Sequence, residues 1–193
     1  MTALVITVAL ALIFTFTNGF HDSANAIAVS IATRALKPVV ALTIAALGNL
    51  VGAFFGAKVA ATIGHGIIDL PSDSGVMLVV AASLIGAIAW NLITWRFGMP
   101  SSSSHALIGG MVGAALMAGS TVLWSGVVDK VVIPMVASPA VGFIAGYIVM
   151  LGVMWSFRRV TPSKARRGFR YAQWASATAM SFGHGMQDAA KTM

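Results

Sequence analysis

Apolar residues dominate the chain in long runs, which short charged or proline-containing stretches separate. The runs cover about 1–33, 38–63, 74–95, 103–128, 131–157 and 171–193. An α-helix rises about 1.5 Å per residue, so about 20 apolar residues cross the hydrocarbon core of a bilayer. Each run reaches that length. The pattern therefore predicts an all-α polytopic membrane protein with about six transmembrane segments.

Composition supports this class and excludes others. Hydrophobic residues make up 58% of the chain and charged residues only 9%, which is not the composition of an ordinary soluble domain. The net charge of +7 lies mainly between the apolar runs, so we expect contact with the lipid bilayer and not with nucleic acid. Cysteine is absent, which excludes disulfides, thiolate nucleophiles and Cys-ligated metals. We expect no metal site and no cofactor.

The basic residues fall in alternate connections between the runs. Arg34 and Lys37 lie in one, Arg96 in another, and six Lys or Arg side chains in 158–170. The positive-inside rule places these connections in the cytoplasm and the connections 64–73 and 129–130 outside. The sequence predicts a multi-pass plasma-membrane protein in which a basic cytoplasmic loop, 158–170, separates a first transmembrane repeat, 1–157, from 171–193.

Glycines spaced four apart recur in several of these runs. One run contains Gly48, Gly52 and Gly56, a second Gly109 and Gly113, and a third Gly142 and Gly146. In lipid, this spacing lets two helices approach closely. We interpret these glycines as packing residues.

A polar stretch interrupts the first apolar run. It reads Asn18-Gly19-Phe20-His21-Asp22-Ser23-Ala24-Asn25. A helix of 33 residues would be about 50 Å long, so a break is expected, and Asn18-Gly19 is the natural place for it. Asp22 or Ser23 would cap the second half-helix. A carboxylate inside the membrane indicates a functional site; the alternative is that Asp22 only caps a helix near the surface.

The last apolar run contains a second copy of this stretch. Gly185-Met186-Gln187-Asp188-Ala189-Ala190-Lys191 aligns with Gly19-Phe20-His21-Asp22-Ser23-Ala24-Asn25 and matches it at Gly, Asp and Ala. Five predicted spans separate the points at which the two copies enter the membrane. The copies would therefore enter from opposite sides, which predicts inverted repeats with broken helices.

A serine-rich segment lies between the two copies. Pro100-Ser101-Ser102-Ser103-Ser104-His105 leads directly into an apolar helix. Serine hydroxyls and the free N–H groups at a helix start donate hydrogen bonds, and the helix dipole there favours an anion. The pattern indicates an anion site; the alternative is a plain helix cap.

In these three stretches the sequence resembles the inorganic phosphate transporter (Pit) family, whose signature Gly-x-Asn-Asp-x-Ala-Asn occurs in two inverted halves. The matching segments are Asn18–Ala26, Pro100–Gly109 and Phe182–Met193. The intervening spans follow in the expected order, so the resemblance covers essentially the whole chain. It departs from the signature where the Asn before Asp is His21 in the first copy and Gln187 in the second.

The resemblance implies a division of roles among the polar residues. Serine hydroxyls would bind phosphate, namely Ser23, Ser102, Ser103 and Ser104. Asp22, Asn25 and Asp188 would hold the coupling ion, and His21 is a possible proton site because His titrates near neutral pH. The half-helix starts at Ser23 and Ser104 would face the phosphate oxygens.

The resemblance implies a secondary transporter, not an enzyme, that carries inorganic phosphate inward with H⁺ or Na⁺. Alternatives within the family are sulfate or a neutral metal–phosphate complex as substrate, and a homo-oligomer is possible. A membrane enzyme using the histidines is a further alternative, but no His-x-x-x-His spacing is present. An equal second repeat would add about 166 residues by the offset between the two copies. The chain therefore looks truncated, and an inactive half-transporter is the last alternative.

Overall fold

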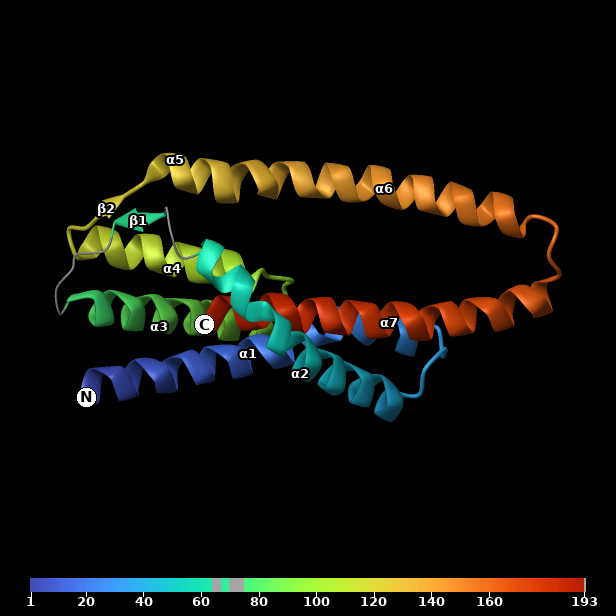
Figure 1. The fold of residues 1–193 in the computed structure, drawn as a ribbon, viewed down its shortest axis with the longest axis horizontal. Coiled ribbons are helices and arrows are strands. Elements are labelled where there is room, and N and C mark those ends of the chain that lie inside the picture. The colour runs from blue at the N-terminus through green and yellow to red at the C-terminus, as the bar shows by residue number, and fades with distance from the viewer. Residues whose placement is uncertain (64–66, 70–74, 193) are drawn as a thin grey trace.

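The computed structural model describes residues 1–63, 67–69 and 75–192, and these are almost entirely helical (Figure 1). The helices are α1 (Thr2–Ala32), α2 (Pro38–Ile63), α3 (Gly75–Arg96), α4 (Ser103–Met117), α5 (Trp124–Val127), the π-helical turn η1 (Val128–Val132), α6 (Ile133–Phe157) and α7 (Pro162–Thr192). Two short strands, β1 (Ile68–Asp69) and β2 (Thr121–Val122), pair antiparallel with Ile68 opposite Val122.

The predicted class, an all-α polytopic membrane protein, is confirmed. Within the described residues, four helical segments are long and apolar enough to span a bilayer: Thr2–Ala32, Pro38–Gly56, Gly75–Arg96 and Trp124–Phe157. Helix α4 is apolar but shorter, with 15 residues. The sixth predicted segment forms the C-terminal part of α7.

The helices lie roughly along one long axis (Figure 1). The α1–α2 and α6–α7 connections lie towards one end, and the β1–β2 pair lies at the other. Helices α1 and α7, which carry the two copies of the polar stretch, run in opposite directions, as inverted repeats require. The α3–α4 connection lies well inside the length of the molecule, so α4 begins partway along the long axis.

An apolar cluster joins α1, α3 and α4. Phe14, Leu84 and Ala87 are buried, and Ala106 and Leu107 of α4 pack against them. Farther along, α4 comes so close to α3 that a Cβ at Gly110 would meet the Ser83 carbonyl oxygen. This cluster fixes the positions of the three helices relative to one another, about one turn into α4 from its start.

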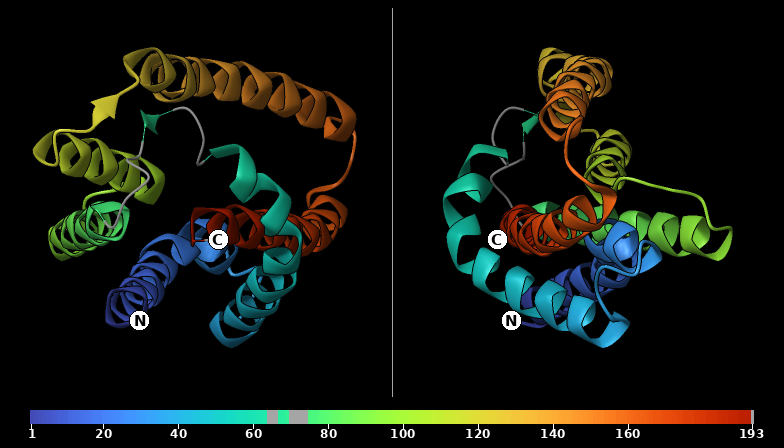
Figure 2. Two further views of the ribbon diagram at one scale, coloured as in Figure 1. Left: turned by 60° about the vertical axis from the view of Figure 1, so that its left-hand side comes forward. Right: turned by 90° about the vertical axis from the view of Figure 1, so that its right-hand side faces the viewer.

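Glycines bring α2 and α7 into near contact, and Figure 2 shows the two helices crossing. A Cβ at Gly48 would lie 2.6 Å from the Ser181 Cβ, and a Cβ at Gly52 would collide with the Phe182 carbonyl oxygen. From the other side, a Cβ at Gly185 would collide with the backbone of Asn49. The packing interpretation is therefore confirmed for Gly48 and Gly52. Among the described residues, nothing lies within 4 Å of the Cβ positions of Gly109, Gly113, Gly142 and Gly146.

The predicted break at Asn18-Gly19 is wrong. Helix α1 runs unbroken for 31 residues, about 46 Å, through the whole polar stretch. A continuous helix satisfies every backbone N–H and C=O internally, whereas a break in lipid would expose them. A helical glycine costs only about 1 kcal/mol relative to alanine, so it does not force a break. As a result, no half-helix begins at Ser23.

The predicted span 103–128 and the outer connection 129–130 are also wrong. Helix α4 ends at Met117, where Gly119 adopts a left-handed φ of 71° and Ser120 N–H bonds the Ala115 carbonyl oxygen. Such a glycine stops a helix. Asp129 and Lys130 instead lie in the π-helical turn η1, inside one helical run from Trp124 to Phe157. Pro134, which has no N–H to donate, follows this turn.

The predicted basic loop 158–170 is a loop only over residues 158–161. Helix α7 begins at Pro162, and the Ala165 N–H bonds the Thr161 carbonyl oxygen. Proline is favoured at the first position of a helix, because its ring sets the helical φ and it lacks only an N–H that would be unbonded there. Most of the basic residues of this segment therefore lie on the first turns of α7.

Candidate functional site

The serine-rich segment builds the start of α4. Ser102 is the N-cap residue, in an extended conformation, and its hydroxyl oxygen accepts from the His105 backbone N–H at 3.4 Å. The Trp90 indole N–H donates to the Ser101 hydroxyl oxygen at 2.9 Å and ties the segment to α3. The predicted half-helix start at Ser102–Ser104 is therefore present, with Ser103 buried, Ser104 half-buried and Ser102 exposed.

Ser103 joins this helix start to the first polar stretch. Its hydroxyl donates to Asp22 Oδ2 at 3.1 Å, and the two side chains come from helices α4 and α1. Ser103 is 1% exposed and the Asp22 side chain 13% exposed. A hydrogen bond to a carboxylate is stronger than one between neutral groups. The contact therefore places a carboxylate directly beside the positive end of the α4 dipole.

His21 lies on the other side of the same carboxylate. Its Nδ1 is 3.8 Å from Asp22 Oδ1, which is ion-pair range but too long for a hydrogen bond. Nδ1 is also buried without a hydrogen-bond partner among the described residues. The Phe20 ring packs on Trp95 of α3, with the two ring centroids 5.3 Å apart. These contacts fix α1 against α3 at the level of Asp22.

Two buried asparagines lie on the helices that make these contacts, Asn18 one turn before Asp22 on α1 and Asn91 one turn before Trp95 on α3. Asn18 of α1 and Asn91 of α3 are each 1% exposed, and Asn18 Oδ1 and both polar side-chain atoms of Asn91 lack a hydrogen-bond partner among the described residues. We call the set Asn18, Asp22, Asn91 and Ser103 the polar layer. Sequence analysis did not single out Asn91; the available signal was an asparagine near the end of the apolar run 74–95.

The second polar stretch builds a separate contact on α7. His184 Nδ1 lies 2.8 Å from Asn49 Oδ1 and 3.2 Å from Asp188 Oδ2. The Asn49 Nδ2 donates to the Ala45 carbonyl oxygen, which leaves Asn49 Oδ1 as the acceptor facing His184. His184 therefore donates from Nδ1. Sequence analysis considered His184 only for an enzyme and did not predict that it would lie beside Asp188.

The other predicted site residues are more exposed or lie outside the described residues. Asn25 is exposed on α1, Ser104 is half-buried, and Gln187 is exposed. The Ser23 side chain and His65 lie outside the described residues. No group of three or more His, Asp or Glu side chains that could hold a metal ion occurs among the described residues.

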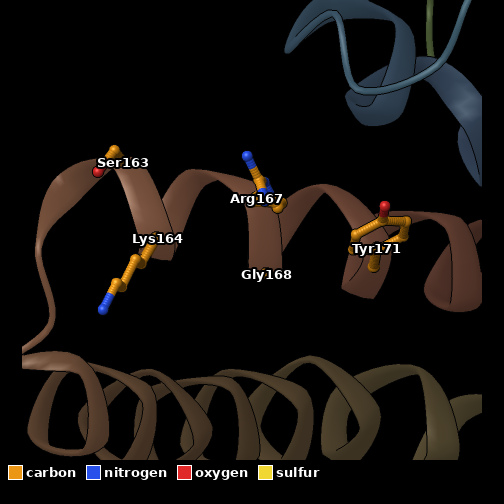
Figure 3. Close-up of a pocket in the computed structure, with 5 residues that line it drawn as sticks. All are labelled: Ser163, Lys164, Arg167, Gly168 and Tyr171. Atoms are coloured by element: carbon orange, nitrogen blue, oxygen red, sulfur yellow. The ribbon is translucent and has the colours of Figure 1, made fainter.

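A pocket of about 420 Å³ lies elsewhere, along the basic start of α7 (Figure 3). Lys164, Arg167 and Tyr171 line it, but Lys164 and Arg167 point to opposite sides of the helix. Arg167 is separated from Asp188 by 21 residues of one helix, about 30 Å. The pocket is therefore not part of the polar layer or of the His184 contact.

Comparisons with known proteins agree with the sequence resemblance. A sequence model described as the phosphate transporter family matches residues 18–167. The chain is 55% identical over 187 residues to a probable low-affinity inorganic phosphate transporter of Streptomyces halstedii, covering 97% of this chain and 88% of that protein. It is 48% identical over 192 residues to a protein of the same description from Mycobacterium tuberculosis strain H37Rv, covering 98% of this chain and 46% of the relative.

A solved structure is similar over the full length of the chain. It is described as the sodium-dependent phosphate transporter, with a TM-score of 0.75 and 28% sequence identity. The match covers 100% of this chain and 53% of that one. The chain thus spans about half the length of the solved protein and of the mycobacterial relative.

Proposed function

The chain belongs to the phosphate transporter family, and from this premise we propose that it forms part of a secondary transporter that moves inorganic phosphate across the plasma membrane with a coupling cation. Such a transporter makes and breaks no covalent bond, so we propose a transport function and not an enzymatic one. The basic segment 158–170 would face the cytoplasm, as the distribution of Lys and Arg predicts.

The contact between Ser103 and Asp22 is the observation that supports this function most directly. It brings a buried hydroxyl and a largely buried carboxylate together at the start of a helix in a membrane protein. Hydroxyl and free N–H groups at a helix start suit an oxyanion. A carboxylate suits a cation, and the cation's charge offsets that of the phosphate.

The structure changes the predicted roles of the serines. The Ser102 hydroxyl oxygen accepts from the His105 N–H as the cap of α4, and we propose that capping is its role. Ser103 is engaged with Asp22, and we propose that it positions the cation-binding carboxylate. Ser104 then remains for phosphate, with the N–H groups at the start of α4. Ser23 loses the helix start that gave it a role, because α1 is continuous there.

Asp188 and Asn25 remain proposed ligands of the coupling ion. Asp188 is 14% exposed and lies on the helix that runs opposite to α1, as a second half-site would. The similar solved protein is described as sodium-dependent. Na⁺ is therefore the first cation to test and H⁺, with His21 as a possible carrier, the second. Phosphate as a metal complex and sulfate are alternative substrates.

The test is uptake of labelled phosphate into proteoliposomes. The 193-residue chain is measured beside a chimeric transporter, in which it replaces the matching half of the Mycobacterium tuberculosis relative. Accumulation driven by a Na⁺ or H⁺ gradient supports the proposal and identifies the ion. Uptake by the chimera alone would identify the isolated chain as an inactive half-transporter. No gradient-driven uptake by either protein would refute the proposed function.

A further inference from the structure

The side-chain amide of Asn91 is buried and makes no hydrogen bond to the part of the chain that the structure describes. It is 1% exposed, and neither its Nδ2 nor its Oδ1 has a partner among the described residues. Because both ends are unpartnered, the orientation assigned to the amide does not affect this result. A buried amide without partners is destabilising, so such a group in a native structure calls for an explanation. The group that fits Asn91 must both accept a hydrogen bond from Nδ2 and donate one to Oδ1.

The packing of α3 on α4 places Asn91 at the start of α4. Ala87, one helical turn before Asn91, belongs to the apolar cluster that Leu107 packs against. Ser103 lies one turn before Leu107, and the Trp90 indole bonds Ser101. Residues four apart share a helix face, so Asn91 and Ser103 lie on the facing sides of α3 and α4, one turn beyond the apolar cluster.

Asn18 lies at the same level on α1. It follows Phe14 of the apolar cluster by one turn, and Asp22 follows Asn18 by another. Asn18 Oδ1 is also buried and has no partner in the described part of the chain. Within that part, the polar layer therefore combines one unpartnered donor, Asn91 Nδ2, with two unpartnered acceptors, Asn18 Oδ1 and Asn91 Oδ1, beside a carboxylate that also accepts.

This combination matches a protonated oxyanion. Hydrogenphosphate has unprotonated oxygens that accept and a P–OH group that donates, whereas sulfate at neutral pH has only acceptors. Building on the proposed function, we propose that Asn91 makes the transporter selective for phosphate over sulfate. Its Nδ2 donates to an unprotonated phosphate oxygen, and its Oδ1, with that of Asn18, accepts from the P–OH group.

Sulfate is disfavoured because it would direct lone pairs at these amide oxygens. A site built to bond a substrate hydroxyl rejects an analogue that lacks it, since the buried polar groups of the site are then left unpaired. Phosphate does not suffer this penalty. The selectivity therefore depends on the hydroxyl of the ligand, and not on its tetrahedral shape or its charge.

The first experiment tests this point in the unmodified chimera. Arsenate, sulfate and fluorophosphate compete with labelled phosphate at neutral pH; fluorophosphate has fluorine in place of the hydroxyl. We expect arsenate, which has a hydroxyl, to inhibit at concentrations close to the phosphate KM. Sulfate and fluorophosphate should need about tenfold more or higher, the effect of one lost hydrogen bond. Fluorophosphate that inhibits as well as arsenate would overturn the inference.

The second experiment tests Asn91 itself. Asn91→Leu keeps the size but removes both polar atoms, so the phosphate KM should rise about tenfold or more. The sulfate inhibition constant should change much less, and its ratio to the phosphate KM should therefore fall. Thr94→Val is the matched control: Thr94 is buried on the same helix, but its hydroxyl already donates to the Trp90 and Asn91 carbonyl oxygens. This control should leave the ratio unchanged.

Asn91→Asp is a second variant that tests the same role if Asn91→Leu fails to insert into the membrane. Asp keeps the shape and presents only acceptors, so the sulfate-to-phosphate ratio should stay at or above the unmodified value. A parallel loss of phosphate and sulfate binding in Asn91→Leu, or a fall of the ratio in Asn91→Asp, would overturn the role of Asn91. These results leave the proposed function intact, because it fails only if the unmodified chimera shows no gradient-driven phosphate uptake.

Discussion

Ser102 and Ser103 are neighbours with the same side chain, but the structure predicts different effects for their replacement by alanine. Ser103 donates at 3.1 Å to the carboxylate of Asp22, and both side chains are largely buried. Ser102 only caps α4, with a hydrogen bond of 3.4 Å. Ser103→Ala should therefore impair binding of the coupling cation, whereas Ser102→Ala should reduce the stability of the helix start.

The size of each effect follows from these contacts. A hydrogen bond to a charged group contributes about 1.5–3 kcal/mol. At about 1.4 kcal/mol per tenfold, Ser103→Ala should raise the cation concentration for half-maximal phosphate uptake by about tenfold to a hundredfold. Loss of a serine cap costs about 0.5–2 kcal/mol of stability, and the long hydrogen bond of Ser102 places it near the lower limit.

The assay measures cation dependence and the amount of inserted protein on the same variants of the chimera. Ser103→Ala should shift the cation dependence at near-normal abundance. Ser102→Ala should lower abundance slightly and leave the cation dependence unchanged. Equal shifts in the two variants, or a shift in Ser102→Ala alone, would show that the Ser103 contact with Asp22 does not position the carboxylate.

Two further predictions concern packing and orientation. Gly52→Val should sharply reduce the amount of folded protein in a detergent-stability assay, because its side chain would collide with the Phe182 carbonyl oxygen and overpacking costs about 1–3 kcal/mol or more. Gly142→Val should be tolerated, because no described residue lies within 4 Å of the added Cβ. Equal losses of folded protein in the two variants would contradict the packing argument. A cysteine at Thr121 should react with an impermeant thiol reagent on intact cells and one at Ser163 should not, and the reverse pattern would invert the proposed orientation.

Sequence patterns predicted the class of the fold and the start of α4 because both depend on local chemistry. Long apolar runs predict membrane helices, and serines before an apolar run predict a helix start, without knowledge of the tertiary structure. The ends of helices inside the apolar runs were harder. A single glycine, Gly119, ends α4 well before the run becomes polar, and the charged pair Asp129-Lys130 lies within a helix. The apolar pattern alone predicts neither the end of α4 at Gly119 nor the helical conformation of Asp129 and Lys130.

The polar layer was predicted only in part. Asp22 and Ser103 stood out because polar residues cluster around each of them in the sequence. Their contact joins residues 81 positions apart, which depends on how α4 packs against α1. Asn91 is one amide in an apolar helix, and only its burial without partners distinguishes it. The break expected at Gly19 was wrong, because the continuous helix keeps its backbone bonded in lipid.

The most direct test of the account is gradient-driven phosphate uptake by Asp22→Asn in the chimeric transporter. Asn keeps the size and hydrogen bonding of the side chain but removes the charge that would bind the coupling cation. The account predicts that the unmodified chimera accumulates labelled phosphate under an inward Na⁺ or H⁺ gradient. Asp22→Asn should insert normally and accumulate almost none. Gradient-driven accumulation by Asp22→Asn close to that of the unmodified chimera would contradict the central role of this carboxylate.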